Sequence, residues 1–115
     1  MTASQTTPPQ MHPDEWRARQ QLAACYRIFV MLGWTEMIYN HITVRLPESV
    51  SGADKHFLIN PFGLHYSEVT ASNLVKINLQ GDVLDHSRYP INPAGYVLHS
   101  TIHGGIEGAH AVMHT

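Results

Sequence analysis

The sequence has little cysteine, little charge and no long apolar run. Cys25 is the single cysteine, which excludes an internal disulfide and fits a reducing compartment. Charged residues make up 14% of the chain and the formal net charge is -2, so no basic excess points to nucleic acid or to an anionic membrane. No stretch approaches the about 20 apolar residues of a membrane-spanning helix, and the N-terminus lacks the basic start of a signal peptide. These absences predict a cytoplasmic protein with neither nucleic-acid nor membrane partners.

Histidine, by contrast, occurs nine times in the 115 residues. Because histidine ligates metals and titrates near neutral pH, this number motivates a search for a metal or acid–base site. The chain is long enough for one domain with its own core and too short for two. We expect a disordered tail over residues 1–13, which are poor in apolar side chains, and one domain over residues 14–115.

The apolar pattern predicts an α/β domain. A helix is expected from an Asp14 cap to Leu32, where Gly33 would end it. A second helix is expected to begin at Pro93 after an Asn92 cap and to end at the glycines at 104 and 105. Strands are expected at 41–46, 56–60, 74–79 with 83–84 as its hairpin partner, and 111–113, with a polar loop at 47–55 and one helical turn at 70–73. This order predicts a mixed or antiparallel sheet with helices packed on it.

The chain ends just as a metal-binding pattern begins. Side chains two apart in a strand share a face, so a His-x-His pair that starts at His114 would need a histidine after Thr115. His110 cannot replace it, because four residues along a strand span about 13 Å. Zinc holds its ligand nitrogens at only about 2 Å. We therefore expect a C-terminally truncated chain with an incomplete ligand set.

His99 and His103 form a second candidate pair on the predicted helix. They lie at i and i+4, the spacing of helical zinc motifs, although Ser100 stands where such motifs place glutamate. The alternative is that His99 bonds a nearby backbone or packs under the sheet while His103 lies near the surface. Because isolated motif matches mostly fail, the alternative is favoured.

Three stretches together resemble the class II aldolase/adducin family, over about residues 14–115. They are Gly33-Trp34 followed by Asn40-His41-Ile42-Thr43-Val44-Arg45; Leu58-Ile59-Asn60-Pro61-Phe62-Gly63-Leu64; and Asn92-Pro93-Ala94-Gly95-Tyr96-Val97-Leu98-His99 leading to His114. The resemblance implies a three-layer α/β/α sandwich and a ring-like homotetramer. It also implies a divalent ion, typically zinc, between subunits, and a glutamate that handles protons in the cleavage or epimerisation of sugar phosphates.

Carried onto this sequence, the family pattern is incomplete. His114 matches one metal-binding histidine, whereas its partner and a third ligand fall beyond the chain. Gly95 stands at the glutamate position and can carry no proton. Pro93 and Ala94 replace the serines that hold phosphate, and Phe62 replaces the threonine of the phosphate loop. Each lost charge-assisted contact is worth about 1.5–3 kcal/mol, so an ordinary sugar-phosphate aldolase is disfavoured.

Four residues at loop–strand junctions are candidates to line a substrate cleft, namely Asn40, His41, Asn60 and Gly63. The alternative is that asparagine and glycine serve only as turn residues there. Asn-His-Ile-Thr together with Ala-Gly-Tyr places the sequence closer to the adducin-like branch of the family than to the sugar-phosphate aldolases.

Three functions follow as hypotheses. The first is a chain derived from a metal-dependent carbon–carbon lyase for a non-phosphorylated carbonyl compound, inactive as 115 residues. Either His41 or a residue beyond the chain would replace its acid–base group. The second is a non-catalytic, adducin-like module for interaction or assembly. The third is an inactive remnant with an exposed sheet edge that invites aggregation. A full-length form would bind zinc or another divalent ion and assemble as a homo-oligomer, a tetramer by the resemblance.

Overall fold

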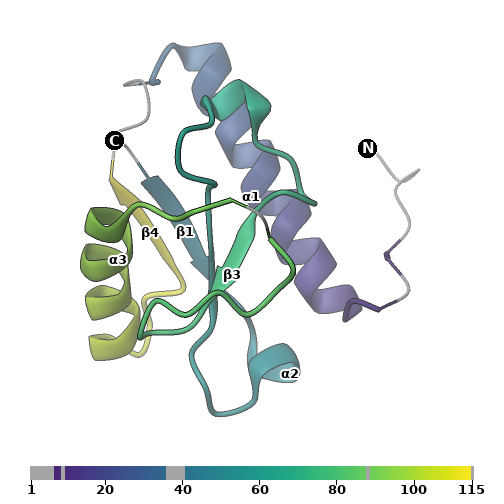
Figure 1. Ribbon diagram of the computed structural model, residues 1–115, viewed down its shortest axis with the longest axis vertical. Coiled ribbons are helices and arrows are strands. Elements are labelled where there is room, and N and C mark those ends of the chain that lie inside the picture. Colours follow the sequence, from purple (N-terminus) through teal and green to yellow (C-terminus); the bar gives the residue numbers. More distant parts are fainter. Residues whose placement is uncertain (1–6, 9, 36–40, 88, 115) are drawn as a thin grey trace.

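The structure is a computed structural model that describes residues 7–8, 10–35, 41–87 and 89–114. Most of the expected tail, residues 1–6 and 9, and the candidate Asn40 lie outside these residues. The fold is mixed α/β, a four-stranded antiparallel sheet with three α-helices and one 3-10 helix (Figure 1). The elements are α1 (Pro13–Leu32), β1 (His41–Arg45), α2 (Glu48–Ser51), β2 (Phe57–Ile59), η1 (Tyr66–Glu68), β3 (Val75–Ile77), α3 (Pro93–Gly105) and β4 (Ala111–His114).

The predicted N-cap of the first helix is wrong by two residues. His12 caps α1, because its Nδ1 accepts a hydrogen bond of 3.0 Å from the Asp14 backbone N–H. Pro13 then occupies the first turn, where its missing N–H costs nothing. Gly33 ends the helix as predicted, in a left-handed conformation with φ 74° that a side chain would disfavour.

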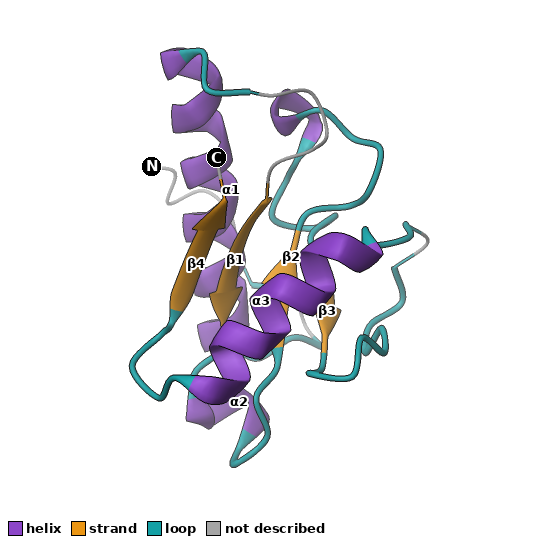
Figure 2. Ribbon diagram, turned by 90° about the vertical axis from the view of Figure 1, so that its left-hand side faces the viewer, coloured by secondary structure: helices purple, strands orange, loops and turns teal. Residues whose placement is uncertain are grey.

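The sheet has the strand order β3-β2-β1-β4, and every neighbouring pair is antiparallel. Helices α1 and α3 lie on opposite sides of it (Figure 2). Side chains alternate along β1: Ile42 packs in the core with α1, whereas Thr43 contacts α3. The prediction of an antiparallel sheet with packed helices is therefore confirmed for the described residues.

Local differences concern the loops. The stretch at 47–55 contains the short helix α2 rather than loop alone, and the 3-10 helix η1 was not predicted. The turn at 70–73 is closed by a hydrogen bond of 3.3 Å from Leu74 N to Thr70 O. The hairpin around Gly81 forms: a bridge between Ile77 and Val83 joins its two sides, with hydrogen bonds of 3.2 Å from Asn78 N to Asp82 O and 2.8 Å from Leu84 N to Lys76 O.

A buried ion network ties α1 to the far edge of the sheet. Arg19 is 2% exposed and binds Glu15 at 2.9 Å and Asp85 at 2.8 Å. Its guanidinium also donates to the Ala71 and Leu74 carbonyl oxygens, and Lys76 joins Glu15 at 2.9 Å. Two cations face two carboxylates, so each buried charge has a partner. The apolar spacing that predicted α1 gave no sign of this network.

Candidate functional site

Three of the predicted site residues, His41, Asn60 and His114, lie at one end of the sheet. Because β1 is antiparallel to both neighbours, its first residue lies opposite the last residue of β4, at the end of the sheet where β2 also ends (Figure 2). His41 and His114 are paired across β1 and β4, and Asn60 directly follows β2. The loop after Asn60 is fixed by a hydrogen bond of 2.9 Å from Phe62 N to Pro90 O, which connects it to the segment before α3.

His41 is buried at this end of the sheet, with 4% of its surface exposed. Its ring lies edge to face with that of His99 on α3, with the centroids 5.8 Å apart. The structure thus places the predicted His41 against a histidine that the sequence had assigned to a different candidate pair. This contact joins β1 to α3 inside the domain.

Asn60 has the clearest unmet bonding capacity at the candidate site. It is 4% exposed, and its side-chain oxygen Oδ1 has no hydrogen-bond partner among the described residues. A buried acceptor left without a donor costs about 1–3 kcal/mol, so a bound donor such as a hydroxyl would recover free energy there. Gly63 has φ 96° with open space around the position of a Cβ, which explains glycine by its backbone conformation.

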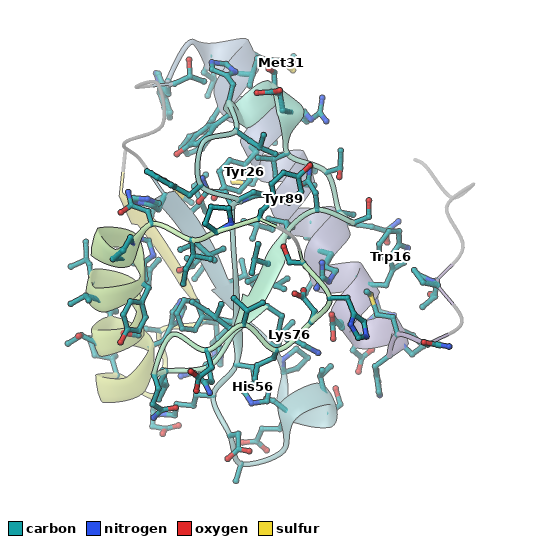
Figure 3. All side chains as sticks on the ribbon, in the orientation of Figure 1. Trp16, Tyr26, Met31, His56, Lys76 and Tyr89 are labelled. Carbon is teal, nitrogen blue, oxygen red and sulfur yellow. The ribbon has the colours of Figure 1, made fainter. Side chains whose placement is uncertain are left out.

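Tyr26 of α1 is hydrogen-bonded to the start of β1. Its hydroxyl donates to the Ile42 carbonyl oxygen at 2.6 Å and accepts from the Ile42 N–H at 3.0 Å, so it lies between α1 and the sheet (Figure 3). Burial raises the pKa of Tyr26 well above its ordinary value, although bonds to the Ile42 and Asn60 backbones oppose the shift. The sequence placed Tyr26 on the apolar face of the helix, but periodicity could not reveal this bonding role.

On the opposite face, Thr43 joins two helical histidines. Its Oγ1 lies 2.6 Å from His99 Nδ1 and 2.8 Å from His103 Nε2. All three side chains are fully buried. The expectation that His103 lies near the surface is therefore wrong: residues at i and i+4 share one face, and here that face packs on β1. His99 does pack under the sheet, as predicted, with a threonine side chain as its bonding partner.

Burial lowers the pKa of His103 below its ordinary value. The hydrogen bond to the Ala109 carbonyl opposes this shift, while the nearby Arg45 and His110 reinforce it. Arg45 also donates to the His103 and Glu107 carbonyl oxygens, so it holds the C-terminal end of α3 against the sheet. A neutral His103 is the form that this environment favours.

A metal ion at this site would need several ligand side chains close together. Nowhere in the described part of the chain do three histidine, cysteine, aspartate or glutamate residues come together as ligands. A catalytic zinc site takes three protein ligands and a structural one takes four. Both helical histidines contact Thr43 instead, so the described residues do not form a metal site by themselves.

A shallow apolar groove runs along the outside of α3, away from Thr43. It is lined by Pro93, Val97, Leu98, Thr101 and Ile102. Helix α3 begins at Pro93 as predicted, with Tyr96 N donating to Asn92 O at 3.0 Å, and Gly95 lies in its first turn.

No helix in the described ranges combines the length and apolar character needed to cross a membrane.

Comparisons with known proteins agree with this architecture. A family model for the Class II Aldolase and Adducin N-terminal domain matches residues 20–115. Over 100 residues the chain is 51% identical to a Caulobacter vibrioides protein whose name places it in aldolase class 2, covering 87% of this chain and 37% of that one. It is 50% identical over 98 residues to alpha-adducin from Rattus norvegicus, covering 84% of this chain and 13% of that one.

A crystal structure of an aldolase II superfamily protein from Pseudomonas syringae has the same fold. It superposes with a TM-score of 0.83 at 46% sequence identity, over 92% of this chain and 42% of that one. The chain therefore spans less than half the length of these relatives.

Proposed function

This chain belongs to the class II aldolase/adducin family, and we propose that the open end of its sheet forms part of a binding site for a small, non-phosphorylated hydroxy-carbonyl compound. The observation that carries the proposal is the buried Asn60 Oδ1, an acceptor without a donor among the described residues. It directly follows β2, at the end of the sheet where His41 begins β1. A ligand hydroxyl is the kind of donor that would satisfy this oxygen.

The absence of phosphate from the proposed ligand rests on the side chains that the chain offers. Phosphate sites use charged groups, hydroxyls or several backbone donors. Pro93 offers neither a hydroxyl nor a backbone N–H, Ala94 has no hydroxyl, and Phe62 beside Gly63 adds none. The first turn of α3 is therefore poorly equipped for a phosphate dianion.

We further propose that His114 is one ligand of a divalent ion in an assembled form, with the other ligands supplied from outside the described residues. A homotetramer and a three-layer sandwich for the whole domain belong to the same proposal. Zinc calorimetry on the 115-residue chain should then detect no binding that depends on His114, so the wild type and His114→Ala should give the same titration. A near-stoichiometric site lost on that substitution would show instead that this chain holds the metal alone.

The ligand proposal is tested by NMR titration with dihydroxyacetone. Saturable shifts are expected at His41 and at the Asn60 side-chain amide. Asn60→Ala should weaken binding about tenfold, the equivalent of one hydrogen bond of about 1.4 kcal/mol. Gln80→Ala removes an exposed amide and should leave binding unchanged. Absence of saturation would refute the binding site, and much tighter binding of dihydroxyacetone phosphate would refute the choice of a non-phosphorylated ligand.

An adducin-like assembly module is the second candidate. Two points support it: by the resemblance Gly95 falls at the position of the family glutamate, and the chain is as similar to alpha-adducin, at 50% identity, as to the aldolase class 2 protein, at 51%. If this candidate is correct, dihydroxyacetone produces no shifts while sedimentation shows oligomers that depend on concentration. Val97→Asp in the α3 groove should dissociate them. Ile28→Asp, at a similarly exposed position on α1, should leave them intact.

A further inference from the structure

Three contacts in series run through the interface between β1, α3 and the loop before β4. His103 Nδ1 lies 3.0 Å from the Ala109 carbonyl oxygen, and His103 Nε2 lies 2.8 Å from Thr43 Oγ1. Thr43 Oγ1 in turn lies 2.6 Å from His99 Nδ1. The three side chains are buried, so each contact must be a properly donated hydrogen bond.

The direction of the first two bonds follows from the chemistry of the partners. A carbonyl oxygen only accepts, so His103 Nδ1 must carry a hydrogen. A neutral imidazole has a single N–H, and the buried His103 is favoured in its neutral form. His103 Nε2 is therefore an acceptor, and the donor to it must be the Thr43 hydroxyl.

The third bond is then determined as well. Thr43 has one hydroxyl hydrogen, which it gives to His103, so toward His99 its oxygen can only accept. The donor in that contact must be His99 Nδ1. Because full burial also disfavours a cationic His99, a single ring hydrogen remains, and it lies on Nδ1.

We infer that Ala109, His103, Thr43 and His99 form one directional hydrogen-bond chain that fixes His99 in its Nδ1–H tautomer and presents its Nε2 as a hydrogen-bond acceptor. The His99 ring lies against that of His41, 5.8 Å between centroids, at the end of the sheet proposed as a ligand site. Thr43 and His103 are therefore positioning residues that act through His99. The group that meets Nε2 must be a donor, either an N–H or O–H of the protein or a ligand hydroxyl.

This inference deepens the proposed function but is tested without any ligand. Long-range 1H–15N correlation spectra of the histidine-labelled 115-residue chain distinguish protonated from unprotonated ring nitrogens. His99→Gln and His103→Gln assign the two rings. In the wild type, both rings should show a protonated Nδ1 and an unprotonated Nε2.

Thr43→Val should affect the tautomers of the two histidines differently. His103 keeps its bond to Ala109 and hence its Nδ1–H form, whereas His99 loses its acceptor and should change to the Nε2–H form or a mixture. Thr43→Ser restores the hydroxyl and should restore the wild-type spectrum. Thr101→Val, at an exposed threonine of α3, is the matched control and should change neither ring.

A wild-type His99 that is protonated on Nε2, or on both nitrogens, would overturn the inference. So would a Thr43→Val spectrum with an unchanged His99. If Thr43→Val does not fold, the wild-type and Thr43→Ser spectra still decide the tautomer. Adding dihydroxyacetone afterwards separates the two proposals: a saturable change of the His99 Nε2 signal identifies a ligand hydroxyl as its donor, whereas saturation at Asn60 with an unchanged His99 signal identifies a donor group of the protein. The tautomer result stands in either case, even if the ligand does not bind.

Discussion

Helices α1 and α3 cover opposite faces of the same sheet, yet β1 offers them different side chains. Toward α1 it presents Ile42, which packs with apolar and aromatic residues such as Leu22 and Phe29. Toward α3 it presents His41 and Thr43, which meet buried histidines. Apolar packing is tolerant of small shifts, whereas buried polar groups are costly unless every bond is made. The difference indicates that the α1 face mainly supplies stability and that the α3 face holds side chains in set orientations.

The α1 face is not purely apolar, because it includes the buried Arg19. Arg19→Leu should lower the free energy of unfolding by the largest amount. The substitution leaves Glu15 and Asp85 without their buried cation, and loss of one partner from a buried ion pair costs about 3–5 kcal/mol. Urea unfolding followed by circular dichroism measures the loss. Arg17→Leu is the matched control, because Arg17 is 70% exposed and its ion pair contributes little. A small effect at Arg19 would mean that Lys76 compensates for the missing guanidinium.

Tyr26→Phe should lower the free energy of unfolding less, by weakening β1, the strand that both helices contact. The ring stays in the apolar core, but the Ile42 N–H and carbonyl lose their hydroxyl partner, at a cost of about 1–3 kcal/mol. Hydrogen exchange should accelerate most at Ile42, where β1 depends on that hydroxyl. Tyr89→Phe changes an exposed tyrosine and serves as control. Equal exchange at Ile42 in both variants would show that the strand end does not depend on Tyr26.

How far the sequence predicted the molecule also differs between the faces. Apolar spacing predicted α1 and the strands, because burial of one stripe or one strand face follows directly from periodicity. Start and stop residues predicted α3. The same spacing could not show that His103 is buried against Thr43, since strand register decides which polar groups meet. Arg19 was missed because a charged residue on a helix is normally solvated. The cap at His12 was missed because sequence rules favour aspartate there.

Acidification should destabilise the protein modestly, through His103 on the α3 face. His103 has a pKa below its ordinary value in the folded protein, so the unfolded chain binds protons more readily. The stabilising contribution is therefore complete above the ordinary value, near 6.5, and is lost as the pH falls below it toward the folded-state pKa.

The groups around His103 are Thr43, Phe57, Ala109, Arg45 and His110; Arg45 and His110 both lower its pKa, and none of the five carries a carboxylate side chain. Urea midpoints at pH 7.5 and 5.5 should fall on acidification in the wild type and fall less in His103→Gln. His86→Gln, at an exposed histidine, should keep the wild-type slope. An unchanged slope in His103→Gln would assign the acid sensitivity to another group. A reduced slope would show that His103, on the α3 face, contributes to the response of this fold to pH.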